Sequence, residues 1–92
     1  MSSYQAFNPE IESHYLASLI QHPQHYGDVG ALVTERDFSP VHRPIYSVIR
    51  QQLETTPPGP TTTVILADKL KAYGVDASKL AGVEPYDYIW AL

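Results

Sequence analysis

A chain of 92 residues has room for one domain, and an apolar content of 43% is enough for a core and too high for intrinsic disorder. The formal charge of −4, from six basic and ten acidic residues, argues against tight nonspecific binding of nucleic acid, which needs clustered Lys and Arg. The absence of cysteine excludes disulfides and cysteine–zinc sites.

No stretch of the sequence is typical of export or of a membrane span. Residues 1–5 have neither a basic run nor an apolar stretch like that of a signal peptide. The longest uninterrupted apolar run, residues 64–67, is far shorter than the ~20 residues that cross a bilayer. We therefore expect a soluble cytoplasmic domain.

The clearest helical signal lies over residues 9–21. Asn8 is a good N-cap, Pro9 fits the first helical position, and acidic side chains in the first turn favour the positive end of the helix dipole. Pro23 ends this helix, because the residue before a proline is disfavoured in the α region. The apolar residues recur at helical spacing and predict one buried face made of Ile11, Tyr15, Leu16, Leu19 and Ile20.

A shorter helix is expected over residues 24–33, although Gly27 and Gly30 each weaken it by roughly 1 kcal/mol relative to Ala. The next few residues form a tight connection that turns Phe38 into the core. The apolar side chains that this second helix should bury are Tyr26, Val29, Leu32 and Val33.

A third helix is expected to start near residues 39–40 and to continue to about Glu54. Its start could lie closer to Val41, which would put Pro44 in the first turn, where proline is tolerated. Its apolar stripe consists of Val41, Ile45, Val48, Ile49 and Leu53.

Residues 55–60 (TTPPGP) cannot be helical and predict a stiff loop. A fourth helix is expected over residues 63–73. It begins with a Thr cap and ends at Gly74, at the position after a helix where the left-handed conformation is common. A looser segment with one turn follows, and Pro85 then opens a last helix-like stretch. The side chains of the fourth helix that should face inward are Leu66, Leu70 and Tyr73.

These elements predict an all-α fold, a small orthogonal bundle of four to five helices. Residues 1–7 are expected to be a flexible N-terminal arm and residues 8–92 the helical domain. The sequence stops within the last apolar pattern with no cap or polar tail, so we expect the domain to be the front part of something longer. The expected core comprises Ile11, Leu16, Leu19, Phe38, Ile45, Ile49, Leu66 and Leu70.

The histidines do not have the spacing of a metal site. Pro23 lies between His22 and His25 at a helix break, so the two do not share a helix face, and no carboxylate at a suitable spacing completes a three-ligand set. His14 and His42 are interpreted as structural or surface residues. We expect no bound metal ion.

Enzyme motifs are also missing from the sequence. No serine lies in a nucleophile elbow, and no G-x-x-x-x-G-K-[ST] loop is present to hold a nucleoside triphosphate. We therefore expect no catalytic residue, no cofactor and no enzymatic activity of this chain.

The C-terminal aromatic residues Tyr86, Tyr88 and Trp90 have two interpretations. They can pack the end of the chain onto the helical core. Alternatively, part of the set faces a partner, because aromatic residues are enriched at the centres of protein interfaces. On the second interpretation, these three residues form a partner-binding site.

Four short motifs, taken in order, carry a family resemblance. They are residues 10–20 (EIESHYLASLI), the pair 37–38 (DF) followed by 42–46 (HRPIY), residues 70–74 (LKAYG) and residues 88–92 (YIWAL). Each is a common helical pattern alone, but their order and separations together resemble the N-terminal domain of DnaB-type replicative helicases. The departures from that family, a Thr cap on the fourth helix and Pro44 beside His-Arg among them, indicate a divergent member.

This resemblance implies a non-catalytic role in DNA replication. In such helicases the N-terminal domains form a collar on the hexameric ring, associate as dimers and present surfaces to primase or to a helicase loader. Unwinding belongs to an ATPase domain of the RecA type, which this chain lacks. The implied partners are other helicase subunits and primase or a loader, with no direct binding of DNA and no membrane.

Two other functions stay open on the sequence alone. The chain could be a stand-alone adaptor or inhibitor that uses the same fold to bind replication proteins. It could also be a small helical DNA-binding module, although its six basic residues are spread along the chain and form no stripe. The codons after Leu92 discriminate the first from the helicase, since a stop codon favours the adaptor and a downstream phosphate-loop motif favours the helicase.

Overall fold

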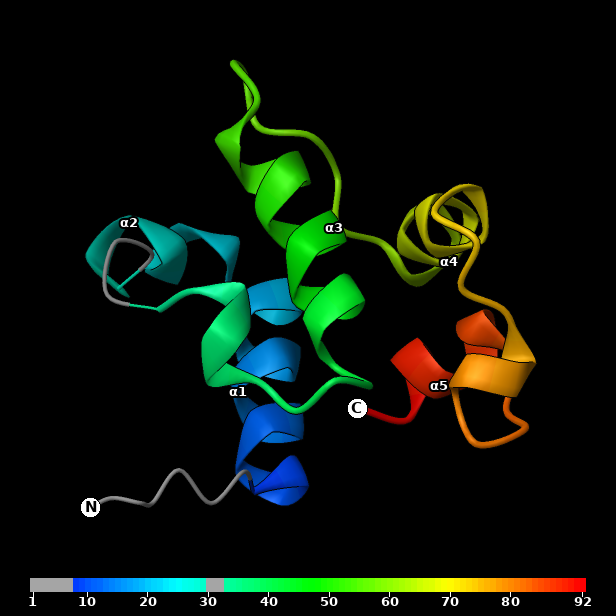
Figure 1. The fold of residues 1–92 in the computed structure, drawn as a ribbon. Helices are drawn as coiled ribbons and strands as arrows, with labels where there is room; N and C mark the ends of the chain where they lie inside the picture. The colour runs from blue at the N-terminus through cyan, green and yellow to red at the C-terminus, as the bar shows by residue number, and fades with distance from the viewer. Residues whose placement is uncertain (1–7, 30–32) are drawn as a thin grey trace.

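A computed structural model describes residues 8–29 and 33–92 of the chain, and all regular structure in these residues is helical (Figure 1). The expected all-α fold is confirmed. The expected arm, residues 1–7, lies outside the described residues. In chain order the elements are α1 (Pro9–Gln21), the 3₁₀ turn η1 (Pro23–His25), α2 (Tyr26–Val29), the 3₁₀ turn η3 (Glu35–Asp37), α3 (Arg43–Glu54), α4 (Thr63–Ala72), the 3₁₀ turn η4 (Ala77–Lys79) and α5 (Pro85–Trp90).

Helix α1 begins and ends where the sequence predicts. The Asn8 side chain accepts hydrogen bonds from the backbone N–H groups of Glu10 and Ile11, each at 3.1 Å, and Pro9 occupies the first helical position. The buried face is nevertheless rotated by about one residue from the expected one. Ile11 is 67% exposed, so its assignment to the core was wrong, and the neighbouring Glu12 is buried instead.

The second expected helix is only partly α-helical in the residues that the structure describes. A 3₁₀ turn occupies its first residues, α2 covers Tyr26–Val29, and Val33 lies outside any helix. Leu32 and the side chain of Val29, both expected to be buried in it, lie outside the described part of the chain. Val33 still contributes to the fold, because its backbone carbonyl accepts a hydrogen bond of 3.0 Å from the Tyr46 hydroxyl.

Helix α3 starts later than residues 39–40. Ser39 begins a turn instead, in which its carbonyl accepts hydrogen bonds from the backbone N–H groups of His42 and Arg43. The helix therefore begins at Arg43, and Pro44 falls in its first turn, where no intrahelical donor is lost.

Helix α4 ends at Ala72, one residue before the expected end, and Gly74 follows with a φ of +85°, the left-handed conformation predicted for it. Tyr73 is 49% exposed, so the expectation that it faces inward was wrong. It lies just past the end of the helix, at the C-cap, beyond the turn whose Leu66 and Leu70 are fully buried.

The core lies where α1, α3, α4 and α5 meet. Helices α1 and α3 pack together in the middle of the molecule, with α2 on one side and the α4–α5 pair on the other (Figure 1). Apart from Ile11, every residue expected in the core is buried in one contiguous cluster. That cluster contains Leu16, Leu19, Phe38, Ile45, Tyr46, Val48, Ile49, Leu66, Ala67, Leu70, Val75, Leu80 and Ile89.

Candidate protein-interaction surface

A buried polar network ties α1 to the start of α3. The Glu12 carboxylate accepts hydrogen bonds from the Ser39 hydroxyl (2.7 Å), the Ser39 backbone N–H (3.0 Å) and Nδ1 of His42 (2.7 Å). Both Glu12 and His42 are almost fully buried. A buried carboxylate is tolerated only when its acceptors are used in this way, so the network is a structural joint between these two helices.

The network extends to α5 through the second ring nitrogen of His42. Tyr88 lies with its hydroxyl 3.1 Å from Nε2 of His42, and the two rings meet edge to face at a centroid distance of 6.0 Å. Because a carboxylate only accepts, Nδ1 of His42 donates to Glu12, and Nε2 on the other side of the ring is left to bond with the Tyr88 hydroxyl. The chain Tyr88–His42–Glu12 is thus a continuous set of hydrogen bonds, which we call the clasp.

The pKa values within the clasp follow from its contacts. Burial of the Glu12 carboxyl favours its neutral form, but the hydrogen bonds from Ser39 and His42 outweigh burial and hold the pKa of Glu12 below its usual value of 4.5. Burial raises the pKa of the Tyr88 hydroxyl, with a smaller contribution from the negative charge of Glu12. At neutral pH the clasp therefore holds an ionised carboxylate and a neutral phenol.

The clasp separates Tyr88 from the other two aromatic residues of α5. Tyr88 is half-buried and faces His42, whereas Tyr86 is 44% exposed and Trp90 is 74% exposed. Tyr86 and Trp90 lie four residues apart and so share one helix face, while Tyr88 lies between them on the opposite one. The three residues that the sequence grouped as a partner-binding site are thus divided between the core and the surface.

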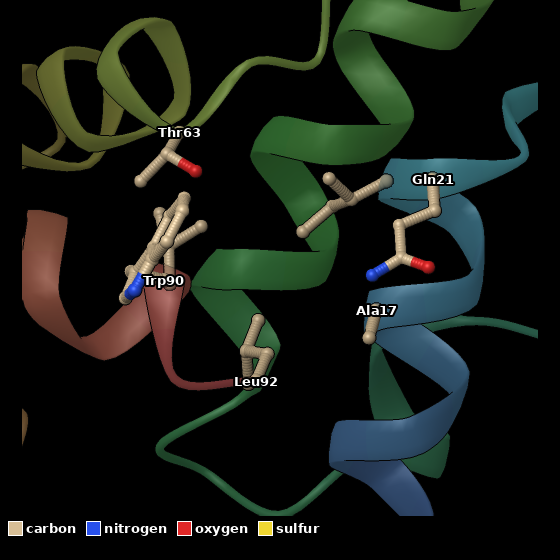
Figure 2. A pocket seen from close by; sticks show the side chains of 7 residues that line it. Ala17, Gln21, Thr63, Trp90 and Leu92 are labelled. Carbon is tan, nitrogen blue, oxygen red and sulfur yellow. The ribbon is translucent and has the colours of Figure 1, made fainter.

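Trp90 borders an apolar groove between α1, α4 and α5. One hollow of about 380 Å³ lies between α1 and α5, and an adjoining one of about 600 Å³ lies along the start of α4. Figure 2 shows Trp90 and Leu92 on one side of the first hollow and Ala17 and Gln21 on the other. We call the two hollows together the Trp90 groove, and its lining residues are Ala17, Ile20, Gln21, Pro60, Thr61, Thr62, Thr63, Val64, Tyr86, Ile89, Trp90 and Leu92.

The extended segment before α4 forms one wall of this groove and is held in place at two points. The Thr61 hydroxyl donates a hydrogen bond of 3.1 Å to the Ile20 carbonyl at the end of α1. The buried Gln52 side chain donates one of 2.7 Å to the Pro60 carbonyl. Gly59 lies so close to that amide that a Cβ would come within 2.6 Å of Nε2 of Gln52. The position of this wall is therefore set by contacts within the chain itself.

His14, His22 and His42 differ in their exposure to solvent. His14 is exposed on α1 and His22 is exposed at its end, while His42 is buried in the clasp. Among residues 8–29 and 33–92, no group of three or more His, Asp and Glu side chains is arranged to hold a metal ion. Within the same residues, no helix has the length and apolar character needed to span a bilayer.

The clasp was not predicted from the sequence. Glu12 and His42 are both positions of the family motifs quoted above, but each motif was interpreted through its apolar residues. A polar residue inside an apolar helical face, as Glu12 is between Ile11 and Leu16, is the signal that could have indicated a buried partner.

Comparison with known proteins identifies the family of this fold. The family model of the DnaB-like helicase N terminal domain matches residues 4–89. No match was found among curated proteins or among solved structures. The matched range covers nearly all of the chain and includes the three clasp residues, Glu12, His42 and Tyr88. The chain belongs to the DnaB-like helicase N-terminal domain family.

Proposed function

We propose that this chain is a non-catalytic interaction domain of a replicative DNA helicase, which serves assembly of the helicase collar and docking of primase or a loader during DNA replication. Family membership supports a helicase-associated role. The sequence has no phosphate-loop motif, so in this proposal ATP hydrolysis and unwinding belong to a separate ATPase domain of the parent helicase.

The observation that carries the proposal is the exposure of Trp90 beside a preformed apolar groove. Trp90 is 74% exposed and Val64 is 56% exposed on the same surface, although burial of each in a core would be favourable. Trp and Tyr are the residues most enriched among binding hot spots, and contiguous exposed apolar patches mark interaction sites. The simplest partner for a first test is a second helicase subunit, since closed two-fold dimers are the commonest assembly.

Sedimentation equilibrium over a range of concentrations tests this proposal. We expect a reversible monomer–dimer equilibrium that Trp90→Ala weakens at least tenfold, because truncating a hot-spot residue costs about 2 kcal/mol or more. Tyr73→Ala is the matched control, since Tyr73 is also an exposed aromatic residue, at 49%, but lies outside the groove. A single monomer mass at high micromolar concentration, unchanged in both variants, would reject self-association through this surface.

A further inference from the structure

The Trp90 groove has an uncharged lining and an acidic surround. None of its lining residues carries a charge at neutral pH. Within four positions of a lining residue in the sequence stand the acidic residues Asp68, Glu84 and Asp87, all exposed, and no Lys or Arg. The nearest basic residue along the chain, Lys69, lies five positions from Val64. Asp68 lies one helical turn after Val64 on α4, Asp87 lies one turn before Trp90 on α5, and Glu84 is the N-cap of α5. An occupant of the groove between these helices therefore meets an apolar floor with a negative rim.

The groove also favours a helical occupant over an extended peptide. An extended peptide that binds through main-chain hydrogen bonds would need free backbone N–H and C=O groups along one wall of the groove. Pro60 has no N–H, its carbonyl already accepts from Gln52, and the Thr62 carbonyl accepts from the Leu66 N–H at 3.0 Å. A helix satisfies its own backbone and presents only side chains, so it can bind an apolar groove in which the Pro60 and Thr62 carbonyls are already used.

We propose that the Trp90 groove binds an amphipathic helix of a partner protein, with bulky aliphatic residues on one face and Lys or Arg flanking that face. The inference rests on the proposed function and specifies the partner chemistry of that same surface. Apolar contacts with Trp90 and Ile20 supply the affinity. Charge complementarity with Asp68, Glu84 and Asp87 supplies specificity and speeds association.

A second copy of the chain is a poorer occupant of the same groove. A two-fold contact centred on Trp90 brings the acidic rim of one copy against the same rim of the other, in a chain whose net charge is already −4. Added salt screens this repulsion and strengthens such a dimer, whereas it weakens the complex with a basic helix. The two occupants are thus distinguished by salt dependences of opposite sign.

Peptide titration tests the inference, with a tryptophan-free helical peptide of about 18 residues, roughly 27 Å long. The basic peptide carries Leu at positions i, i+3, i+4 and i+7 along one face and Lys beside them. One matched peptide has Glu in place of every Lys, and another has Ser in place of every Leu. Trp90 is the single tryptophan of the chain, so its emission reports occupancy of the groove directly.

We expect the basic peptide to shift Trp90 emission to the blue and to bind more weakly as salt is raised, while neither matched peptide binds. With a labelled basic peptide, Trp90→Ala should abolish the anisotropy change. Asp87→Asn should weaken binding roughly two- to fivefold, the range of one exposed ion pair. Glu10→Gln removes the same charge from an exposed position outside the groove and should leave binding unchanged.

The remaining outcomes overturn the inference in distinguishable ways. Equal binding of the Lys and Glu peptides, or equal effects of Asp87→Asn and Glu10→Gln, would show that charge does not select the occupant. Self-association lost in Trp90→Ala, with no peptide bound up to about 1 mM, would refute the helix and leave the proposed function standing. Neither peptide binding nor self-association would reject both.

Discussion

Replacing Glu12 by Gln should destabilise the domain far more than its position in the first turn of a helix suggests. The Glu12 carboxylate directs one oxygen at three donors, and its second oxygen lies 3.1 Å from the Ser39 backbone N–H. In the Gln variant one of these oxygens becomes an NH₂ group. A donor then faces the Ser39 N–H, and the donors that met a charged acceptor meet a neutral one.

The magnitude follows from those contacts. Hydrogen bonds to charged groups contribute about 1.5–3 kcal/mol each, roughly twice a neutral one, and a buried donor left without an acceptor costs about 1–3 kcal/mol. We therefore expect Glu12→Gln to lower the free energy of unfolding by about 2–3 kcal/mol. A domain of this size has only about 5–14 kcal/mol in total, so the change is easily measured.

Urea denaturation followed by circular dichroism at neutral pH measures this difference. The matched control is Glu10→Gln, the same chemical change in the same first turn but at an exposed position. The control loses only a favourable interaction with the helix dipole, so its effect should stay below about 1 kcal/mol. Equal free energies of unfolding in the two variants would refute the clasp as a stabilising joint.

The pH dependence gives an independent check with a definite sign. The folded-state pKa of Glu12 lies below its unfolded value, so the carboxylate stabilises the fold fully above the unfolded pKa, near 4.5. That contribution is lost as the pH falls through the folded-state pKa. The contribution of the carboxylate to the difference in stability between the parent and Glu12→Gln should therefore be fully present above about pH 4.5 and shrink below it.

Three further predictions test the core, the groove wall and the proposed absence of DNA binding. Ile49→Ala should lower the free energy of unfolding by about 2–5 kcal/mol, because Ile49 is fully buried, whereas Ile11→Ala should change it by less than about 0.5 kcal/mol in the same denaturation assay. Gly59→Ala should cost about 1 kcal/mol by displacing the Gln52 amide from the Pro60 carbonyl, and this cost should vanish in a Gln52→Ala background. Fluorescence titration with single- or double-stranded DNA should give no binding tighter than about 10⁻⁴ M at physiological salt; a salt-sensitive micromolar complex would favour the DNA-binding alternative.

The helix boundaries that the sequence predicted correctly are those set by local chemistry. The Asn8–Pro9 cap, the stop before Pro23 and the left-handed Gly74 each depend on residues within one turn of the boundary. The start of α3 was predicted too early because it depends on a distant residue. Ser39 is held in a turn by Glu12, which lies 27 positions earlier in the chain. No sequence pattern near Ser39 indicates that contact.

The error at Ile11 has the same origin. Hydrophobic periodicity allows two faces for α1, one centred on Ile11 and Tyr15 and one on Leu16 and Leu19, and apolarity alone favours including Ile11. The structure turns Glu12 inward because Ser39 and His42 supply donors for its carboxylate. A satisfied buried charge therefore decided the rotation of the helix, and the apolar Ile11 was left in solvent.

For the C-terminal aromatic residues, the sequence grouped three side chains that the structure separates. Helical spacing alone separates Tyr86 and Trp90 from Tyr88, because residues four apart share a face and residues two apart do not. What the sequence could not predict is that Tyr88 finds a buried partner in His42, or that residues 60–64 would form the facing wall. Both depend on tertiary contacts across more than 20 positions of the chain.

The clasp and the groove are coupled through α5. This helix has six residues, too few to be stable alone in water, so its position depends on tertiary contacts. Those contacts include the buried Ile89, which also lines the groove, and the hydrogen bond between Tyr88 and His42. Trp90 extends into solvent from a helix that is fixed on its opposite face by the clasp. Under the proposed function, an anchor held in this way loses less conformational entropy on binding, so the buried network that stabilises the fold would also favour binding of a partner.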